Sequence, residues 1–152
     1  MSASVTDIDA RRRWMSVLAK AEADELESVW RELPATPDYR LLRGPEVGLV
    51  MVCGRAGGTG TRFNLGEMTV TRCTVELPGG RVGHAYVRGR RPRHAELSAV
   101  LDAMLQDPVR AAAGAQSVVE RLATAQARRR RAAEARTART RVEFLTLVRG
   151  EE

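Results

Sequence analysis

Apolar residues recur at helical spacing near the start of the chain, in one stripe over residues 14–21 and a second over 26–33. The second stripe begins five positions after Ala21, and five residues rotate a straight helix by about 140° beyond one full turn. Asp24 and Glu27 have the spacing of a capping box, so we predict a break and a second short helix there. Such a pair forms a helix-turn-helix or an αα-hairpin packed on a sheet, and the hairpin is the commoner arrangement.

Strand-like runs occupy the middle of the chain, over residues 39–43, 47–55, 65–77 and 82–90. The second run contains Val-Gly-Leu-Val-Met-Val-Cys, which is apolar on both faces, as is typical of a central strand. The third run alternates, with Cys73 and Val75 on one face and Arg72 and Thr74 on the other. Pro78-Gly79-Gly80 is a strong turn signal. Strands joined by short glycine-rich turns predict an antiparallel meander.

Helix-prone sequence follows the strands. Pro92 can start a helix whose apolar residues, from Leu97 to Leu105, have amphipathic spacing, and Asp107-Pro108 ends it. Residues 109–140 are rich in alanine and arginine, and residues 142–148 have the composition of a strand. We therefore predict an α+β fold. It has an antiparallel β-meander with an N-terminal helical pair, one amphipathic helix after the meander, an Arg-rich helical segment, and a C-terminal strand joining the sheet.

The length of 152 residues suits a single domain over 1–152. No stretch approaches the roughly 18 consecutive apolar residues of a membrane helix. No signal-peptide core follows the basic residues near the N-terminus, so we expect a cytoplasmic protein with no membrane partner. Cys53 and Cys73 fit a reducing compartment, and we predict neither a disulfide nor a metal site from their spacing.

Positive charge is concentrated in one C-terminal segment. The net charge is +6, and residues 110–141 hold nine arginines against two glutamates, so their +7 leaves −1 on the rest of the chain. A localised positive field favours an acidic partner, such as nucleotide phosphates, nucleic acid or an acidic protein face. A helix whose arginines face solvent explains the same pattern, and on charge alone this explanation is slightly favoured.

A loop with four glycines in seven residues joins the second and third strand-like runs. Glycines let backbone N–H groups approach an anion, and arginines can clamp its oxygens. The candidate phosphate- or partner-binding residues here are Arg55, Gly57, Gly58, Gly60 and Arg62. The loop lacks the Gly-Lys-Ser/Thr ending of a Walker loop, and no helix follows to supply a dipole. A flexible hairpin connection is therefore the alternative explanation.

The other chemically able side chains are Glu67, Arg72, Cys73, His84 and His94. His84 shares the more exposed face of its strand with Tyr86, and it can accept a proton or bind a ligand near neutral pH. His94 lies at the start of a helix, where a capping or structural role is the simple interpretation. Cys73 lies on an apolar strand face, and we interpret it as a thiol buried in the core. No nucleophile elbow, zinc motif or carboxylate pair is present, so His84 and Glu67 remain as catalytic candidates and no independent catalytic site is predicted.

Several motifs extend over nearly the whole chain. They include Leu42-Arg43-Gly44-Pro45-Glu46, Gly54-Arg55, Gly57-Gly58-Thr59-Gly60, the long run Phe63–Cys73, Gly83-His84-Ala85-Tyr86 and His94-Ala95-Glu96-Leu97. By these motifs the chain resembles the PhnG family, small subunits of the bacterial carbon–phosphorus lyase machinery for phosphonate breakdown. One departure is Arg91, where the family pattern has an acidic residue.

The resemblance implies a subunit role. PhnG-like proteins act with PhnI, PhnH and PhnL to displace adenine from MgATP with a phosphonate such as methylphosphonate. A core hetero-octamer holds two copies each of PhnG, PhnH, PhnI and PhnJ, and the chemistry is usually placed on PhnI. MgATP is then a substrate of the complex, and no cofactor is predicted to bind this chain. In this setting we expect the glycine-rich loop, its arginines and Arg72 to line an interface or an anion-bearing channel, and residues 109–140 to become ordered in the complex.

Two other functions are compatible with the residues. A nucleic-acid-binding module would use Arg128–Arg131 and the N-terminal helical pair, and it would bind DNA or RNA with a steep salt dependence. A self-sufficient enzyme would use His84 and Glu67, and it would turn over ATP without partners. The subunit role is the interpretation that we carry forward, because the resemblance is specific and no catalytic constellation is visible.

Overall fold

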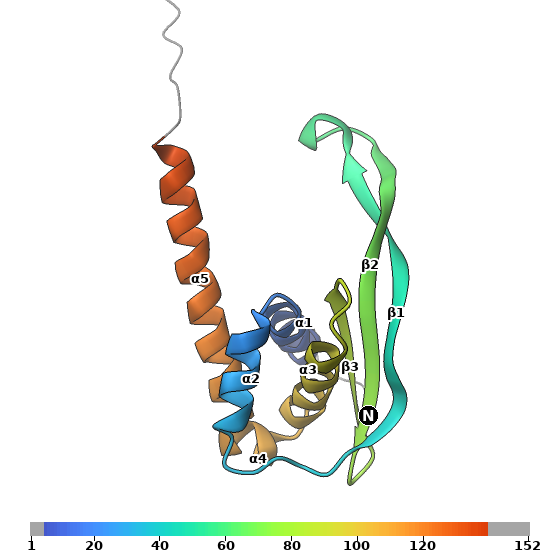
Figure 1. Cartoon of the computed structure of the whole chain (residues 1–152), viewed down its shortest axis with the longest axis vertical. Coiled ribbons are helices and arrows are strands. Elements are labelled where there is room, and N and C mark those ends of the chain that lie inside the picture. Colours follow the sequence, from blue (N-terminus) through green and yellow to red (C-terminus); the bar gives the residue numbers. More distant parts are fainter. Residues whose placement is uncertain (1–4, 140–152) are drawn as a thin grey trace, which may run out of the picture.

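The computed structural model describes residues 5–139. In this range it has the predicted α+β fold, with two N-terminal helices, an antiparallel meander and further helices (Figure 1). The helices are α1 (Val5–Ala19), α2 (Ala23–Arg31), α3 (Pro92–Leu105), α4 (Pro108–Arg110) and α5 (Gln116–Ala138). The strands are β1 (Arg40–Arg55), β2 (Arg62–Leu77) and β3 (Arg81–Arg88). A 3-10 turn, η1 (Ala56–Gly58), links β1 to β2, and a π-helical segment, η2 (Ala111–Ala115), leads into α5. The predicted C-terminal strand over 142–148 lies outside the described residues.

The sheet has the order β1-β2-β3, so β2 is its central strand and β1 lies at an edge. The prediction that the apolar run Val47–Cys53 forms a central strand is therefore wrong. Within the described range, the run pairs with β2 on one side only. Apolar residues on both faces indicate that a strand is covered when the protein functions, and the cover need not come from the same chain.

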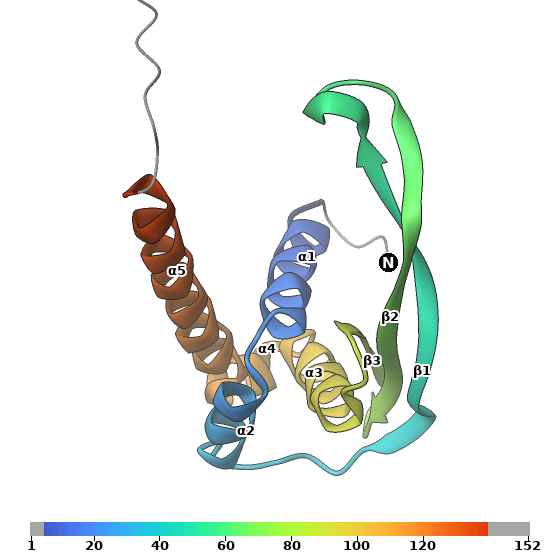
Figure 2. The same ribbon diagram turned by 45° about the horizontal axis from the view of Figure 1, so that its top comes forward.

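β1 and β2 are each 16 residues long, whereas β3 has 8 residues. β3 pairs with Val70–Leu77 of β2, so residues 49–69 continue past β3 as a two-stranded hairpin. We call residues 49–69 the arm. Figures 1 and 2 show that the arm projects from the helical body in the same direction as the second half of α5.

α3 forms the centre of the core. It packs on the sheet, and α1, α2 and η2 contact its other sides. Its spacing predicts an amphipathic helix, but 11 of its 14 residues are buried, so the helix has no broad solvent face. The difference arises because Ala95, Ala99 and Ala103, which carry little hydrophobic signal, are each 0% exposed. Such small side chains let neighbouring elements approach the helix closely.

α1 and α2 are separate helices, as the slip in the apolar stripe predicts. The capping-box interpretation of Asp24 and Glu27 is wrong, because α2 begins at Ala23 and its N-cap, Glu22, makes no side-chain hydrogen bond. Asp24 lies instead in the first turn, where its charge interacts favourably with the helix dipole. The helical pair packs mainly on α3 and α5, and α1 also contacts β3, so it is not a simple hairpin laid on a sheet.

The Ala/Arg-rich segment is helical, as predicted. Asp107 follows the C-cap of α3 and caps α4, because its carboxylate accepts a hydrogen bond from the Val109 N–H over 3.0 Å. The first turns of α5 bury Val118, Val119 and Leu122. Beyond them α5 extends away from the body (Figure 1).

We expect Gly83→Ala to destabilise the fold, because Gly83 is the point where β3 touches α3. A Cβ atom there would lie 2.0 Å from the Ala99 carbonyl oxygen and 2.6 Å from the Ala103 backbone nitrogen. The helix and strand would have to separate, and we expect a loss of about 2–3 kcal/mol in the free energy of unfolding. Urea denaturation measures this loss. Gly48→Ala is the matched control, since a Cβ atom there meets nothing within 4 Å. Equal losses in the two variants would contradict the packing explanation.

Candidate functional site

Exposed apolar side chains gather on the β1–β2 hairpin. Of ten large hydrophobic side chains exposed in the described range, seven belong to this hairpin. The seven are Leu41, Leu42, Val47, Leu49, Met51, Phe63 and Leu65. Scattered exposed hydrophobic residues are ordinary, but a contiguous group marks an interaction surface. The hairpin is therefore the first candidate for a functional surface.

The core-facing side of the sheet continues into the arm without cover. Leu49 pairs with Thr69, two positions before the buried Thr71, and directly paired residues point to the same side of a sheet. Val47 and Met51 lie on the same face by the two-residue period of the strand. Their exposed fractions are 44% for Val47, 61% for Leu49 and 53% for Met51. We call these three residues the apolar strip.

A β-bulge interrupts the arm. The register shifts between Val52 and Cys53, opposite Gly66 and Asn64. Gly66 has a φ of 155°, in the range that side-chain-bearing residues rarely adopt. Bulges bend and twist a strand pair, and Figure 2 shows the end of the arm curving toward the helices. The apolar strip lies on the side toward which the arm curves.

The glycine-rich loop forms the tip of the arm. Gly57 and Gly58 have φ values of 58° and 84°, which permit the tight turn. The amides of Thr59 and Gly60 both donate to the Ala56 carbonyl, Gly60 over 2.8 Å. These two N–H groups are used inside the loop, so an anion at the tip would depend on the remaining amides and on neighbouring arginines.

Arg55 and Arg62 lie directly opposite each other where the loop begins, and both are exposed. Like charges in this arrangement destabilise a strand pair. Arg55 donates to the Gly60 carbonyl over 3.3 Å, and neither arginine reaches a carboxylate of the described residues. The tip therefore carries two uncompensated positive charges. Contact of Arg55, Gly57, Gly58, Gly60 and Arg62 with a phosphate or partner stays a prediction.

The two catalytic candidates are not brought together. His84 pairs with Thr74 in the sheet, and its Nδ1 shares a hydrogen bond of 3.2 Å with the Thr74 hydroxyl. Glu67 lies on the arm, seven positions before Thr74 on the same strand, which corresponds to roughly 23 Å at about 3.3 Å per residue. Arg72 is engaged with a different residue, because its Nε donates to Glu46 over 3.0 Å and thereby lowers the pKa of that carboxyl group. These positions form no acid–base pair.

Cys73 is a core residue, as predicted, and of the two roles predicted for His94 the structure shows the structural one. His94 is 4% exposed, and its Nε2 donates to the Leu18 carbonyl over 2.8 Å, which ties α3 to α1. Cys73 is 1% exposed, and burial raises the pKa of its thiol to about 11. Cys53 is exposed on the arm, and both thiols are free.

We expect the free energy of unfolding to fall as the pH drops below 6.5, the ordinary pKa of histidine, because burial lowers the pKa of His94 in the folded chain. The unfolded chain then binds a proton that the folded chain does not bind, so stability is fully present above the unfolded pKa and is lost as the pH falls toward the folded pKa. The slope is at most about 1.4 kcal/mol per pH unit. Urea denaturation on both sides of pH 6.5 measures it. His94→Gln should flatten the slope and His84→Gln, at an exposed position, should keep it; a slope that survives in His94→Gln would disprove the assignment.

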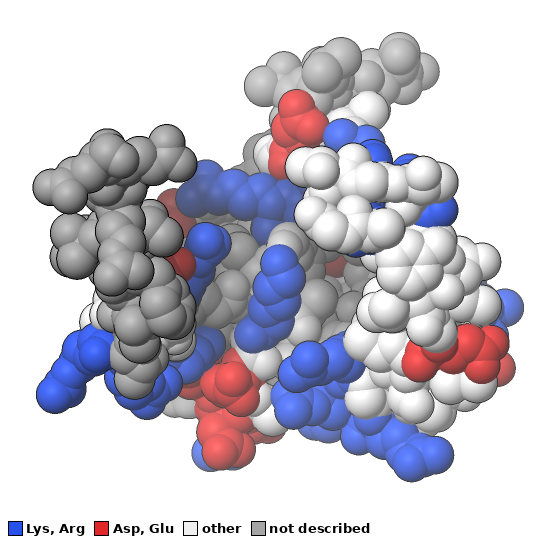
Figure 3. All heavy atoms as spheres, turned by 90° about the horizontal axis from the view of Figure 1, so that it is seen from above, with Lys and Arg blue, Asp and Glu red and all other residues white. Residues whose placement is uncertain are grey.

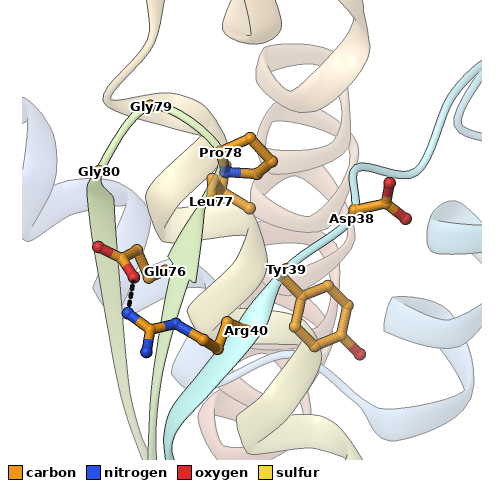
Figure 4. Close-up of a pocket in the computed structure, with 8 residues that line it drawn as sticks. All are labelled: Asp38, Tyr39, Arg40, Glu76, Leu77, Pro78, Gly79 and Gly80. Carbon is orange, nitrogen blue, oxygen red and sulfur yellow. Dashed lines mark hydrogen bonds and ion pairs between the residues drawn. The ribbon is translucent and has the colours of Figure 1, made fainter.

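A pocket of about 390 Å³ lies at the end of the sheet opposite the arm, between the start of β1 and the turn after β2 (Figure 4). Arg40, Glu76 and Tyr39 of its lining are engaged within the chain, whereas Asp38 is exposed and reaches no cation among the described residues. Arg40 pairs with Glu76, shown by the dashed line, and the Tyr39 hydroxyl donates to Glu96 over 2.5 Å. Burial, together with Glu96, raises the pKa of Tyr39, so the phenol stays protonated. Apart from the exposed Asp38, the lining therefore presents no charged group without a partner in the described residues.

A second pocket, of about 440 Å³, lies between the end of α1 and the end of β3. Lys20, Arg88 and Arg91 line it. This group was not predicted from the sequence, because Lys20 is distant in sequence from the two arginines and no motif joins them. The run Arg88-Gly89-Arg90-Arg91, basic and at the end of a strand, is the signal that could have indicated it.

No three His, Cys, Asp or Glu side chains of the described range gather closely enough to hold a metal ion. No helix in the same range has both the length and the hydrophobicity needed to cross a bilayer.

Similarity to known proteins extends along the whole chain. The family described as "Phosphonate metabolism protein PhnG" matches residues 9–150. The chain is also 44% identical over 156 aligned positions to the alpha-D-ribose 1-methylphosphonate 5-triphosphate synthase subunit PhnG of Rhizobium meliloti (strain 1021), covering 100% of this chain and 99% of that relative. Both matches include the arm, the core helix α3 and α5. The chain therefore belongs to the PhnG family of phosphonate metabolism proteins.

Proposed function

We propose that the chain is a subunit of alpha-D-ribose 1-methylphosphonate 5-triphosphate synthase and does not act alone. In this reaction a phosphonate oxygen attacks C1 of the ribose of MgATP, the bond from C1 to adenine breaks, and adenine leaves. The full-length similarity to a relative named as a subunit of this synthase supports the proposal. It also agrees with the separation of His84 from Glu67, which leaves the chain without an acid–base pair of its own.

The exposure of the apolar strip is the main structural support for the subunit role. Val47, Leu49 and Met51 face the side that is buried lower in the sheet, yet each is more than 40% exposed. Water is an unfavourable environment for such a surface, and burial of apolar area is the main favourable term in association. The strip continues the core, so a partner that covers it would extend the core across the interface. We assign this surface to another subunit of the synthase.

The partners that we propose are PhnI, PhnH and PhnJ in the core hetero-octamer, with PhnL joining for the reaction. PhnI is the partner expected to supply the catalytic groups, since the described part of this chain holds no such constellation. No cofactor is assigned to the chain, and MgATP is a substrate of the complex. The arm and the second half of α5 project in the same direction, so one partner can contact both (Figure 1).

Co-expression of the tagged chain with PhnH, PhnI and PhnJ from the same organism tests this function. We expect a stoichiometric complex on sizing, and adenine release from ATP and methylphosphonate once PhnL is added. Recovery of the chain alone with bound nucleic acid would overturn the proposal in favour of the arginine helix. The structure lends that rival little support, because Arg129 pairs with Glu25 and Arg130 pairs with Glu134.

We expect Arg55→Ala combined with Arg62→Ala to lower adenine release or assembly by about tenfold, because it removes both uncompensated charges from the tip of the arm. The effect should shrink at high salt, where such charges are screened. Sizing and adenine release separate a loss of assembly from a loss of turnover. Arg31→Ala combined with Arg81→Ala removes the same charge from exposed positions outside the arm and α5 and is the control. Unchanged assembly and turnover in the tip variant would show that the tip has neither role.

A further inference from the structure

The pocket between α1 and β3 is built from three segments that meet at the foot of the arm. Lys20 and Glu22 follow α1, Arg88 and Arg91 lie at and beyond the end of β3, and Met68 comes from the adjoining part of β2. Its volume is about 440 Å³. A smaller pocket, of about 220 Å³, adjoins it along β3 and shares Tyr86.

The cations of this pocket differ from most others on the surface. Many arginines of the chain form ion pairs, including Arg72, Arg81, Arg93 and Arg121. Lys20, Arg88 and Arg91 reach no carboxylate in the described range, and the Lys20 ammonium donates only to the neutral Ser16 hydroxyl, over 3.0 Å. Glu22 is the one acidic residue of the lining, so the pocket has a net charge of +2. Figure 3, viewed from above, shows basic side chains gathered between α5 and the arm.

The backbone that presents these cations is held in place. The Arg91 N–H donates to the Thr71 hydroxyl over 2.8 Å, and that hydroxyl donates to the Gly89 carbonyl over 2.6 Å. The Gly89 N–H donates to the Thr69 carbonyl over 2.8 Å. Thr71 is 0% exposed, so the turn that carries Arg88 and Arg91 is anchored in the core. A fixed turn reduces the entropy lost when a ligand binds.

We infer that this pocket binds a phosphate-type oxyanion that carries two or more negative charges. Lys20 after α1 and Arg88 and Arg91 at the end of β3 can supply charge-assisted hydrogen bonds from two segments of the chain, and Arg is suited to bidentate contact with such oxygens. Tyr86 and Met68 supply an apolar wall beside them. The inference rests on the proposed function. The substrates of that reaction offer two sources of the anion, which are the triphosphate chain of the nucleotide and the phosphonate. The pocket dimensions and three cations favour the triphosphate chain.

Nuclear magnetic resonance titration of the full chain with inorganic tripolyphosphate, and separately with methylphosphonate, tests the inference. We expect saturable shifts of the amides over 19–22 and 86–91 with tripolyphosphate, and weaker binding of methylphosphonate. Lys20→Gln and Arg91→Gln should each weaken tripolyphosphate binding by about tenfold. Arg90→Gln is the matched control, because it removes one exposed charge beside the pocket without changing its lining. Tighter binding of methylphosphonate would assign the same pocket to the phosphonate.

Two results would overturn the inference. One is the absence of saturable shifts over 19–22 and 86–91 with either anion, or shifts confined to the tip of the arm and α5. The other is equal weakening by Arg90→Gln and Arg91→Gln, which would indicate general charge attraction. Failure of the proposed function gives a different result. If the chain binds tripolyphosphate in this pocket but joins no synthase complex, the proposed function is refuted and the anion site is supported. A chain that assembles and supports adenine release but binds neither anion there refutes the site alone.

Discussion

Replacing Leu49 and Met51 by aspartate is expected to abolish recovery of the chain in the synthase complex, with a loss of affinity of at least about 100-fold. Both side chains belong to the apolar strip and are more than half exposed in this chain. A partner that covers the strip would have to bury two carboxylates against an apolar surface, and unpaired buried charges are costly. Pull-down with a tagged partner, followed by sizing and assay of adenine release, measures the loss.

The variant should leave the isolated chain folded, because neither side chain contributes to the described core. Thermal unfolding of the isolated chain checks this point. Ile8→Asp combined with Val109→Asp is the matched control, since Ile8 and Val109 are 45% and 78% exposed and lie outside the hairpin. The control should assemble normally. Normal assembly of the strip variant, or equal disruption by both pairs, would remove the arm from the interface.

Short-range patterns were sufficient to predict most elements. The period of two over β2 identified the buried face of the sheet, on which Thr71, Cys73 and Val75 are each no more than 1% exposed. Pro78-Gly79-Gly80 identified the turn, where Gly79 and Gly80 adopt positive φ values of 98° and 79°. These predictions succeeded because strand periodicity and turn chemistry are local properties of the chain.

The order of the strands could not be predicted in the same way. The run Val47–Cys53 has the composition of a central strand, and it lies at an edge of the sheet. Hydrophobicity indicates that burial of a surface is favourable. It does not indicate whether the residues that bury it belong to the same chain or to a partner. The same uncertainty applied to α3, whose alanines gave no indication that helices pack on its other sides.

The candidate site was predicted in part. The glycine-rich loop and its arginines were identified from composition, and the structure places them at the tip of the arm. The pocket at the foot of the arm was not predicted, because Lys20 and Arg91 meet only through the packing of α1 beside β3. Asp102 was not singled out either, since a lone aspartate in an apolar helix gives no sign of its partners.

We expect Asp102→Ala to lower the free energy of unfolding by about 3–5 kcal/mol. Asp102 is 0% exposed and accepts hydrogen bonds from two other elements of the fold, α1 and β3. Arg11 donates through Nε over 3.1 Å and through Nη2 over 2.8 Å, the Trp14 indole donates over 2.8 Å, and the His84 backbone N–H donates over 2.9 Å. Removal of the carboxylate takes the acceptor from all of these donors, of which Arg11, with a side chain 34% exposed, can still reach water. Urea denaturation measures the loss.

The matched control is Asp9→Ala, which removes a carboxylate from the exposed pair with Arg12 and should cost less than about 1 kcal/mol. Similar losses in the two variants would show that the Asp102 cluster is no stronger than a surface ion pair. Asp102 also holds α1 beside β3, and the two elements together form the anion pocket. A variant that stays folded, such as Arg11→Gln, should therefore weaken tripolyphosphate binding although Arg11 does not line the pocket. Unchanged binding would show that the pocket keeps its geometry without the Arg11–Asp102 pair.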